Sequence, residues 1–533
     1  MNLMCAFLPL LNFLLSLSTE PKFISSTRHV AIDSILEDKK RMSVFPLQRL
    51  DNNLDFQTLD GRDRSFARAM VTTVERRKGQ IDKVIGMCRK KSHDKKKRED
   101  MWIDAVLRLG AAQLLFLDVP HHAAVKETIE ILRSIPVKIP ESKIKFANAI
   151  LRRLGREGKE LLSQHTEVCD NITPWLLEQL QKDWGNRKAK QISEAFMKKN
   201  PIHLTVPYDQ NHSSAGSRQE SLDIIKDAIG GETCVLPNGS IKVGDDMKGL
   251  VSKIPLYDEG AWWVQDASAS LAAHALYNSF QPSALAETHV VDMCSAPGGK
   301  TAQLISMGFK RVTAVEVSER RSRQLKKNLE RLRMTEKCTL CLKDGTDWTA
   351  DDDNPVDAIL LDAPCSATGT GSRRPDVLQR SSDIEDLLET QQKLAVHCID
   401  NILQPGGILV YATCSILKAE GERQVEKLLS RAEGEKVETV PFQDTEVRGF
   451  EDCIAENGWL RILPGDLPNS VGPCDGFFVA RLRRCGTVID SNLDMNDRVP
   501  LEKKTVLELK EMLRNRGLKI SGKKSDLIDR LLS

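Results

Sequence analysis

Apolar residues recur at helical spacing from about residue 26 to residue 165. The stretch RDRSFARAMVTTVERRKGQIDKVI (62–85) has the three-and-four spacing of an amphipathic helix. The stretch WIDAVLRLGAAQLLFLDVPHHAAVKETIEIL (102–132) predicts two more helices, separated just before Pro120 because proline disfavours helix in the residue ahead of it. With KFANAILRRLG (145–155) as a closing helix, the pattern predicts an all-α domain over residues 26–165.

The next part of the chain, residues 166–275, has a mixed pattern. An amphipathic helix is predicted at 172–184 and a short strand at 201–206. At 235–243 two apolar runs flank an Asn-Gly pair, which is a strong hairpin signal. We interpret this part as a connecting α/β region.

From residue 276 onward the rhythm changes to short strands separated by helical segments. The apolar runs HVVDM, RVTAVEV, DAILLDA and GILVYAT each precede or follow a helical stretch, and GFFVARLRR (476–484) predicts a late strand. Strands alternating with helices are typical of a parallel sheet with crossover helices. We therefore expect an α/β domain of Rossmann-like type over residues 276–485.

Both ends of the chain depart from these patterns. Residues 1–25 hold an apolar run from Leu3 to Leu17, which at 15 residues is shorter than the ~20 that a membrane span needs. We interpret it as a targeting leader or a misassigned start, and we expect no stable membrane association. After a polar linker (486–499), residues 500–533 predict two short amphipathic helices with capping residues.

Cysteine and charge usage narrow the class of protein. The 13 cysteines have no paired spacing, which favours a reducing, intracellular compartment; an organelle and the nucleus remain alternatives. The close pair Cys338 and Cys341 lacks a second pair at zinc-finger spacing, and the adjacent His121 and His122 project in different directions, so we expect no metal site. The net charge of +2 gives no global basic field, although seven of the 12 residues at 88–99 are Lys or Arg.

The stretch VVDMCSAPGGKTAQL (290–304) has two readings. A phosphate-binding loop would require a glycine where Cys294 stands, and Pro297 removes a backbone donor, so nucleotide hydrolysis is excluded. A glycine turn after the first strand of a Rossmann-like sheet instead pairs with an acid at the end of the next strand, and Glu316 stands 17 positions after Gly299. Without a dinucleotide motif, S-adenosylmethionine fits best, with Asp344 after the third strand placed to reach the adenine amino group.

Two cysteines follow the predicted fourth and fifth strands. Cys365 ends DAILLDAPC and Cys414 ends GGILVYATC, and ligands bind at the carboxyl ends of strands in open parallel sheets. If these strands are neighbours, only ~4.8 Å apart, both thiols flank one cofactor. A thiolate that adds to carbon-6 of cytosine makes carbon-5 nucleophilic enough to take a methyl group, which points to cytosine-5 methylation. Amino-group methyltransferases instead use an Asp/Asn-Pro-Pro-aromatic turn, which is not present in DAPC.

Several motifs of the chain resemble those of known protein families. DRSFARAMV, LRLGAAQLLFLDVPHHAAVKETIE and KFANAILRRL resemble the NusB-type helical RNA-binding module, and the C-terminal helix pair resembles the SAP motif, which usually binds DNA. CSAPGGKT, DAPCSATGTGSRRPD, YATCSIL and CDGFFVARL resemble the RNA cytosine-5 methyltransferases, in particular the bacterial ribosomal RNA small-subunit methyltransferase B type. The resemblance implies a multidomain chain whose substrate is RNA, with DNA as a further possible partner of the SAP-like pair.

The resemblance also implies roles for single residues. Cys414 would be the nucleophile and Cys365 would assist product release. Asp362 would lie between cofactor and base, and Lys300 would be a polar contact in the same pocket. The expected cofactor-binding residues are Cys294, Ser295, Ala296, Pro297, Gly298, Gly299, Lys300, Glu316, Asp344 and Asp362. Arg373 and Arg374, in the loop after Cys365, are expected to contact RNA phosphates. The sequence departs from the family at 418–421, where Lys-Ala-Glu-Gly replaces the usual Pro-Glu-Glu-Asn, so we expect an altered turn below the nucleophile.

Two alternatives remain open from the sequence. A non-catalytic RNA-binding assembly factor would keep the fold without needing both thiols. A DNA cytosine methyltransferase would use the cysteine of the fourth-strand Pro-Cys motif, Cys365, and would leave Cys414 without a role.

Overall fold

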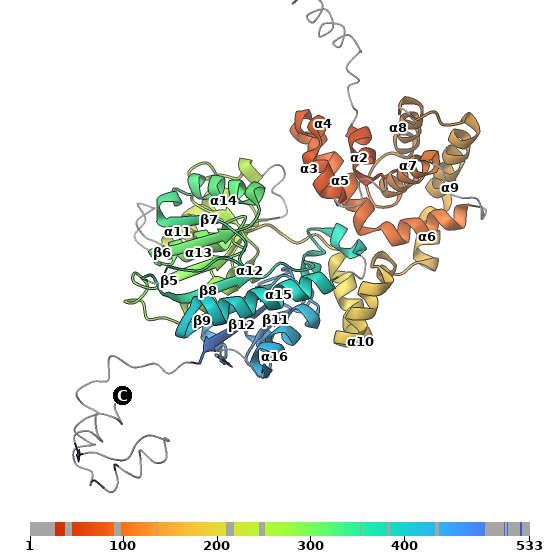
Figure 1. The fold of residues 1–533 in the computed structure, drawn as a ribbon. Coiled ribbons are helices and arrows are strands. Elements are labelled where there is room, and N and C mark those ends of the chain that lie inside the picture. Colours follow the sequence, from red (N-terminus) through yellow and green to blue (C-terminus); the bar gives the residue numbers. More distant parts are fainter. Residues whose placement is uncertain are drawn as a thin grey trace, which may run out of the picture.

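The structure is a computed structural model that describes most of the chain between residues 27 and 485. The described ranges are 27–37, 45–89, 98–135, 137–208, 218–244, 251–351, 353–380, 384–431, 436–468 and 470–485, with isolated positions 506, 509, 523 and 524. The predicted leader, the linker and nearly all of the SAP-like helix pair lie outside the described residues. The described part forms a helical lobe and a larger lobe built on a sheet, which lie side by side (Figure 1).

The helical lobe, residues 27–165, consists of eight described helices packed around one core. They are α2 (Thr27–Ile35), α3 (Pro46–Asn52), α4 (Leu54–Thr58), α5 (Gly61–Arg76), α6 (Lys78–Cys88), α7 (Arg98–Leu115), α8 (His121–Ser134) and α9 (Glu141–His165). The break predicted before Pro120 is confirmed. The prediction of one helix over 62–85 is wrong, because the segment is divided at Arg77. Helix α6 turns there and brings Gly79 against the backbone of Asp170. A Cβ on Gly79 would lie only 1.6 Å from the carbonyl oxygen of Asp170.

The connecting region begins with η2 (Val168–Asn171) and α10 (Pro174–Phe196), which bends at Gly185, where φ is 79°. Beyond it, a small antiparallel sheet has the order β2-β3-β1-β4 and is accompanied by α11 and η4. The bounds are β1 (His203–Thr205), α11 (Arg218–Ile229), β2 (Cys234–Val235), β3 (Ile241–Lys242), η4 (Val251–Lys253) and β4 (Trp263–Val264). The predicted hairpin is confirmed, with Gly239 of the Asn-Gly pair at φ 80°.

The sheet lobe is built on a mixed sheet with the order β10-β12-β9-β8-β5-β6-β7, and β11 pairs with β12. Its strands are β5 (His289–Met293), β6 (Arg311–Glu316), β7 (Cys338–Leu342), β8 (Val356–Asp362), β9 (Leu403–Thr413), β10 (Val437–Thr439), β11 (Leu460–Ile462) and β12 (Phe477–Arg484). Strands β5 to β9 are parallel to one another, whereas β12 runs antiparallel to β9. The predicted α/β class is confirmed.

Helices cover both faces of this sheet because alternate strand residues point to opposite faces. On one face α12 (Ala267–Tyr277), α13 (Gly299–Ser306) and α14 (Glu319–Arg331) pack on side chains such as Ala358 and Leu360. On the other face α15 (Glu385–His397), η8 (Cys398–Ile402) and α16 (Glu422–Ser430) pack on side chains such as Ile359 and Leu361. Helix α12 crosses the boundary expected between residues 275 and 276, because its apolar side is buried against the sheet.

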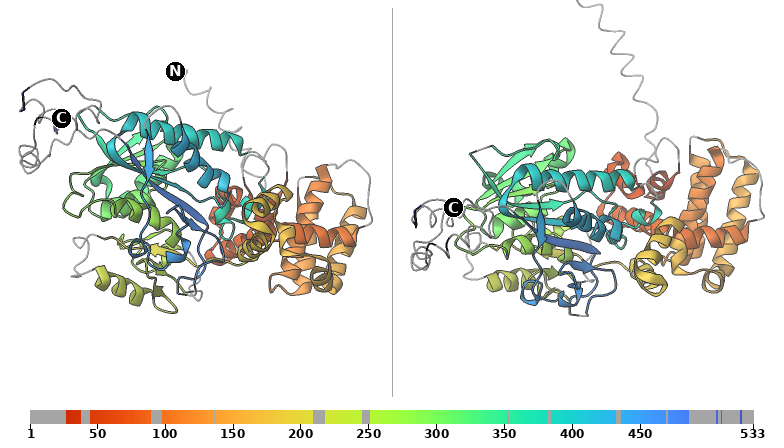
Figure 2. Two further views of the ribbon diagram at one scale, coloured as in Figure 1. Left: turned by 90° about the horizontal axis from the view of Figure 1, so that it is seen from below. Right: turned by 60° about the horizontal axis from the view of Figure 1, so that its bottom comes forward.

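The two lobes meet where α5 and α6 of the helical lobe face the loop after β8 and the segment before α10. Arg76 Nη2 donates to the carbonyl oxygen of Ser372 at 2.7 Å, and Gln80 exchanges hydrogen bonds with Asn171 at 3.0 and 2.8 Å. In both views of Figure 2, α10 lies at this junction. Among the described helices, none is long and apolar enough to cross a membrane.

Candidate active site

The turn after β5 begins the site. Cys294 has φ 62° and Gly298, the N-cap of α13, has φ 98°, so the chain folds back tightly between strand and helix. The backbone of the turn is tied to the next strand: Ser295 N donates to the carbonyl oxygen of Val315 at 3.1 Å, and Ala296 N donates to Glu316 Oε2 at 3.2 Å. The turn and the end of β6 therefore form one unit, as the glycine-turn reading predicted.

The two strand-end acids have different environments. Glu316 is 2% exposed and accepts hydrogen bonds from the backbone of Ala296 and, at 2.9 Å, of Ser318. Asp344, after β7, is exposed, and its Oδ1 accepts from Thr346 N at 2.9 Å and Thr346 Oγ1 at 2.8 Å. Each carboxylate keeps acceptor capacity beyond these bonds, so both can still receive donors from a ligand.

A cavity of about 480 Å³ opens at the carboxyl ends of β5 to β9. Its lining includes six of the predicted site residues: Cys294, Glu316, Asp344, Asp362, Cys365 and Cys414. Arg374 also lines it, whereas residues 295–300 of the turn do not. Residues from four separate motifs thus share one cavity, which we call the active-site cavity.

Cys365 and Cys414, which we call the thiol pair, lie next to one another in this cavity. Strands β8 and β9 are parallel neighbours, and Ala363 N donates to the carbonyl oxygen of Ala412 at 2.9 Å just beyond the paired segment. The two Sγ atoms are 3.5 Å apart. The two strands are neighbours and both thiols line one cavity, whereas their place beside a cofactor stays a prediction.

Lys300 and Asp362 form an ion pair beside the thiol pair. Lys300 Nζ lies 2.7 Å from Asp362 Oδ2 and 5.4 Å from the centre of the Phe477 ring. Burial alone would lower the pKa of Lys300, but the charge and hydrogen bond of Asp362 outweigh it and raise that pKa. Asp292 and Cys414 add to this rise in the pKa of Lys300, so the lysine stays charged beside the thiol pair.

The other two thiols of the site are held protonated. The hydrogen bond with Cys414, followed by burial, raises the pKa of Cys365 well above its ordinary value. Burial, with Asp362 and Glu316 nearby, raises the pKa of Cys294 to about 12. Neither thiol is suited to be the attacking thiolate at neutral pH, which leaves Cys414 as the nucleophile candidate of the cavity.

The two arginines expected to contact RNA have unequal surroundings. Arg373 is bound to buried carboxylates, with Nη2 2.5 Å from Asp266 Oδ2 and Nε 3.0 Å from Asp475 Oδ2. Arg374 is 48% exposed, pairs with Asp376 at 3.1 Å and lines the active-site cavity. Contact with RNA stays a prediction for both, and Arg374 has the more accessible guanidinium.

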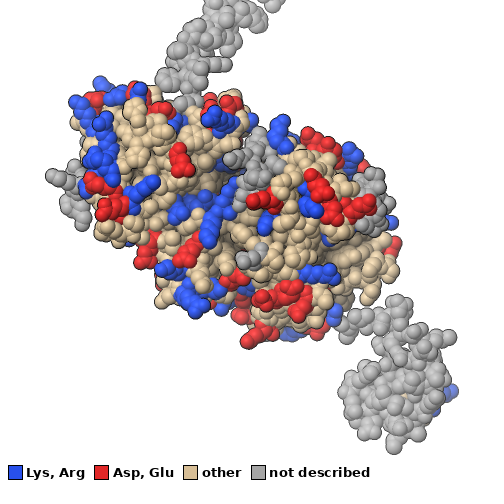
Figure 3. All heavy atoms as spheres, turned by 180° about the vertical axis from the view of Figure 1, so that it is seen from behind, with Lys and Arg blue, Asp and Glu red and all other residues tan. Residues whose placement is uncertain are grey.

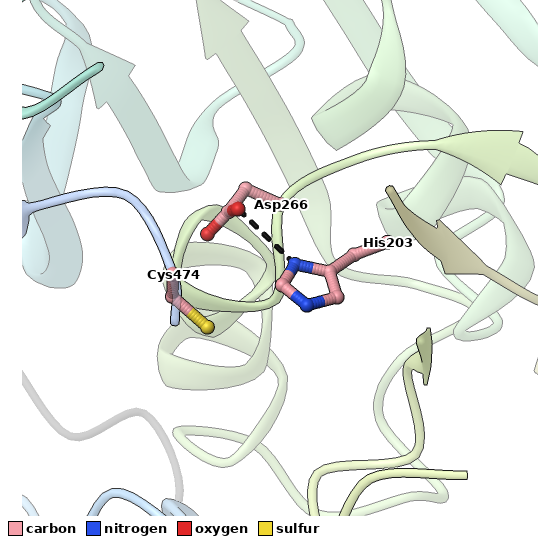
Figure 4. Close-up of side chains that lie close together, drawn as sticks. All are labelled: His203, Asp266 and Cys474. Carbon is pink, nitrogen blue, oxygen red and sulfur yellow. Dashed lines mark hydrogen bonds and ion pairs between the residues drawn. The ribbon is translucent and has the colours of Figure 1, made fainter. Parts of the chain in front are cut away.

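One cluster resembles a metal site but already contains a cation. His203, Asp266 and Cys474 place ligand atoms within 4.8 Å of one another, and His203 Nδ1 lies 3.1 Å from Asp266 Oδ2 (Figure 4). The same Asp266 oxygen bonds the guanidinium of Arg373, which also lies 3.5 Å from His203 Nδ1. The negative charge of Asp266 is therefore balanced by the guanidinium of Arg373. We interpret the cluster as an ion-pair network that fixes the loop after Cys365.

The turn below the nucleophile is held despite its departure from the family pattern. Lys418 N donates to Asp183 Oδ2 at 2.9 Å, a bond that the usual proline could not make. Trp184 Nε1 donates to the carbonyl oxygen of Ile416 at 2.9 Å, and the Lys418 ammonium lies 4.5 Å from the centre of the Trp184 ring. Helix α10 thus supports the loop of Cys414.

Sequence reasoning missed several residues of the site. Val317 lines the cavity with 63% of its surface exposed, and its place directly after the strand-end acid was a usable signal. Arg321, whose guanidinium bonds the carbonyl oxygen of Ala296 at 2.5 Å, and Gln391, whose amide bonds that of Pro364 at 2.9 Å, lie on helices whose polar positions carry no distinguishing pattern. Glu420 was noted only as part of a divergent turn.

Three family models match separate segments of this chain. The family model described as 16S rRNA methyltransferase RsmB/F matches residues 282–483, the NusB family model matches 26–156, and the SAP domain model matches 500–533. Ribosomal RNA small subunit methyltransferase B of Xylella fastidiosa is 32% identical over 438 residues, covering 79% of this chain and 90% of its own length. The protein of the same name from Klebsiella pneumoniae is 32% identical over 462 residues, covering 85% and 96%.

A solved structure shows the same fold. The crystal structure of PH0851 superposes with a TM-score of 0.62, covering 87% of this chain and 99% of its own at 20% identity. The identity and coverage of the curated relatives, together with the three domain matches, confirm the resemblance seen in the motifs. The chain belongs to the RsmB/F family of 16S rRNA methyltransferases, with a NusB-family domain before the catalytic domain and a SAP domain after it.

Proposed function

We propose that this protein uses S-adenosylmethionine to methylate carbon-5 of a cytosine in ribosomal RNA, through a covalent intermediate on Cys414. The observation that carries the proposal is the thiol pair, with Sγ atoms 3.5 Å apart, in one cavity with Glu316 and Asp344. The curated relatives are ribosomal RNA small subunit methyltransferases B, which supports ribosomal RNA as the substrate class.

The cavity suits an adenosine without phosphates. Glu316 would accept hydrogen bonds from ribose hydroxyls, and Asp344 would accept one from the adenine amino group. Val317 also lines the cavity and offers it an apolar side chain. When bound, S-adenosylmethionine would supply the methyl group, and Cys294 of the turn, which lines the cavity, would lie beside it.

The thiol pair would carry the chemistry. Cys414 Sγ would bond to carbon-6, so that carbon-5 can form its bond to the methyl group. A base would then take the carbon-5 proton as the sulfur–carbon-6 bond breaks and the thiolate returns. Cys365, protonated at neutral pH and 3.5 Å away, would assist this release by hydrogen bonding to the departing sulfur.

RNA would reach the cavity from the side where the two lobes meet. Arg374 and Arg380 line the cavity, and the guanidinium of Arg380 also lies 5.1 Å from the Phe45 ring of the helical lobe. Lys and Arg side chains gather in the hollow between the lobes on the face shown in Figure 3. Such charges bind the RNA backbone without reading its sequence.

The test uses labelled S-adenosylmethionine and ribosomal RNA with single-cysteine variants. Cys414→Ala should abolish methyl transfer and adduct formation, because no thiolate remains to add to carbon-6. Cys365→Ala should accumulate a protein–RNA adduct that survives denaturing electrophoresis, because release of the methylated base is impaired.

Cys234→Ala is the matched control, since Cys234 is also half-buried but lies in β2, outside the active-site cavity. It should transfer methyl groups at the wild-type rate and trap no adduct. Full transfer by Cys414→Ala would refute the assignment of the nucleophile. Folded wild-type protein that binds RNA but never methylates it would favour the assembly factor.

A further inference from the structure

A buried carboxylate lies directly beneath the thiol pair and bonds to both of its loops. Glu420, the last residue of η9 (Lys418–Glu420), is 0% exposed. Its Oε1 accepts from Ser366 N at 2.8 Å, and its Oε2 accepts from Ser366 Oγ at 2.5 Å and Ser415 Oγ at 2.6 Å. Ser366 directly follows Cys365 and Ser415 directly follows Cys414, so one side chain ties together the two residues next to the thiols.

Further hydrogen bonds extend this connection. Thr368 Oγ1 lies 3.0 Å from Ser415 Oγ and accepts from Ile416 N at 3.2 Å, and Gly369 N donates to the carbonyl oxygen of Cys414 at 2.9 Å. The loop after β8 and the loop after β9 therefore interlock. Their relative position is set by polar contacts of defined length rather than by apolar packing alone.

Gln391 of α15 completes the arrangement. Its Nε2 donates to Glu420 Oε1 at 3.0 Å and to the carbonyl oxygen of Pro364 at 2.9 Å, the residue before Cys365. Glu420 thus accepts four hydrogen bonds, two on each carboxylate oxygen. A buried carboxylate is tolerated when it is satisfied in this way.

We propose that Glu420 is a positioning residue that sets the spacing of Cys365 and Cys414. It does not line the active-site cavity, so it acts through the serine that follows each cysteine. Its negative charge also contributes, after the Cys414 hydrogen bond and burial, to raising the pKa of Cys365, which helps to keep that thiol protonated. The catalytic part of this proposal rests on the proposed function, whereas the spacing of the thiols does not.

The spacing is tested first, without RNA or cofactor. A trivalent aromatic arsenical bridges two thiols, with loss of one water, only where they lie close together. Glu420→Gln keeps the shape but offers one acceptor oxygen in place of two, so at least one loop should move. We expect bridging of the thiol pair, followed by mass spectrometry, to slow by about 10-fold, since an ångström of displacement changes such rates by one to two orders of magnitude.

The second measurement is methyl transfer by the same variant. We expect kcat to fall by about 10- to 100-fold with KM for both substrates within about threefold, because the reacting groups move while the binding surfaces stay. Cys365 should also be alkylated at a lower pH than in the wild type. Glu446→Gln is the control, since Glu446 is a partly buried carboxylate, with 13% of its side chain exposed, that pairs with Arg481 at 2.9 Å outside the cavity.

If the arsenical bridges the thiol pair of Glu420→Gln at the wild-type rate, the proposal is overturned, whatever the methyl-transfer activity of the variant. A loss of bridging equal to that of Glu446→Gln would also overturn it, because the effect would then be one of general stability. If Glu420→Gln does not fold, Ser366→Ala and Ser415→Ala each remove one donor to the carboxylate and should each slow bridging. Normal bridging with no methyl transfer in the wild type would contradict the proposed function and leave the spacing role intact.

Discussion

At the scale of single residues, Asp292 beneath the cofactor turn is the most perturbed acid of the site that has no assigned chemistry. It is fully buried, and its Oδ2 accepts from Thr301 Oγ1 at 2.5 Å, while Oδ1 has no hydrogen-bond partner among the described residues. Burial raises the pKa of Asp292 to about 7, against the opposing effects of Thr301 and Lys300. The carboxyl is therefore neutral over much of the acidic range.

This pKa predicts a pH-dependent contribution to stability. In the unfolded chain Asp292 loses its proton near pH 4, whereas the folded protein keeps it to about pH 7, so stability falls as pH rises through this window. Asp292→Asn removes this dependence. The free energy of unfolding of the variant relative to the wild type should rise by about 2–3 kcal/mol from pH 5 to pH 8, at about 1.4 kcal/mol per pKa unit.

Urea unfolding of the two proteins at both pH values measures this difference. Thr301→Val is a useful comparison, because it removes the bond to Oδ2 but keeps the carboxyl group and hence the pH dependence. A difference between Asp292→Asn and the wild type that is the same at pH 5 and pH 8 would show that the carboxyl ionises normally in the folded protein.

The thiol pair was predictable from sequence at this scale, and Glu420 was not. Each cysteine follows an apolar strand run, and the carboxyl ends of neighbouring parallel strands must meet. Two of the three partners of Glu420 are distant in sequence: Ser366 is 54 positions away on a loop and Gln391 is 29 away on a helix, and the apolar pattern defines the orientation of neither. Polar networks of this kind depend on the finished fold.

At the scale of elements, the start of α13 shows how a local conformation shapes the cofactor site. Gly298 has φ 98°, and a Cβ there would lie 3.1 Å from Leu325 Cγ of α14. Only glycine adopts this conformation without strain, which costs other residues about 1–2 kcal/mol. Gly298→Ala should therefore displace the turn and weaken S-adenosylmethionine binding by about 10-fold, measured by calorimetric titration.

Gly308, just after the other end of α13, is the control for this prediction. Its φ is 108°, and a Cβ there would meet only Leu285 Cδ1 at 3.7 Å. Gly308→Ala should lower stability by a similar strain energy but leave cofactor affinity unchanged. Equal losses of affinity in both variants would mean that the effect reflects the stability of α13 rather than the shape of the turn.

The elements predicted well are those with long apolar runs. The central strands β5, β6, β8 and β9 are buried on both faces, so their sequences are continuously apolar and readable. Strands β10 and β11 have only three residues each and pair with β12, so their apolar runs are too short to predict a strand. The break at Arg77 was missed for a related reason, because a contact with Asp170 in another element imposes it.

At the scale of the whole molecule, the contact between the lobes places the helical lobe against the loop that follows the thiol pair. Arg76 of α5 donates to the carbonyl oxygen of Ser372, and the same loop carries Arg374, which lines the active-site cavity. Removing this charged hydrogen bond should loosen the loop at the proposed entrance for RNA. Arg76→Met is expected to raise KM for RNA by about 10-fold, since such bonds contribute about 1.5–3 kcal/mol, while cofactor affinity stays unchanged.

Arg68→Met separates this effect from damage to the helical lobe. Arg68 lies on the same helix but pairs with Asp51 inside the lobe, and both side chains are about half exposed, so its loss should leave KM and stability nearly unchanged. Steady-state methylation of ribosomal RNA by the three proteins, with calorimetric titration of S-adenosylmethionine, measures both quantities. If Arg76→Met weakens cofactor binding as much as RNA use, the helical lobe supports the whole sheet lobe. If only KM for RNA changes, the helical lobe acts on methyl transfer through the loop after Cys365. That loop then connects the helical lobe to the active-site cavity.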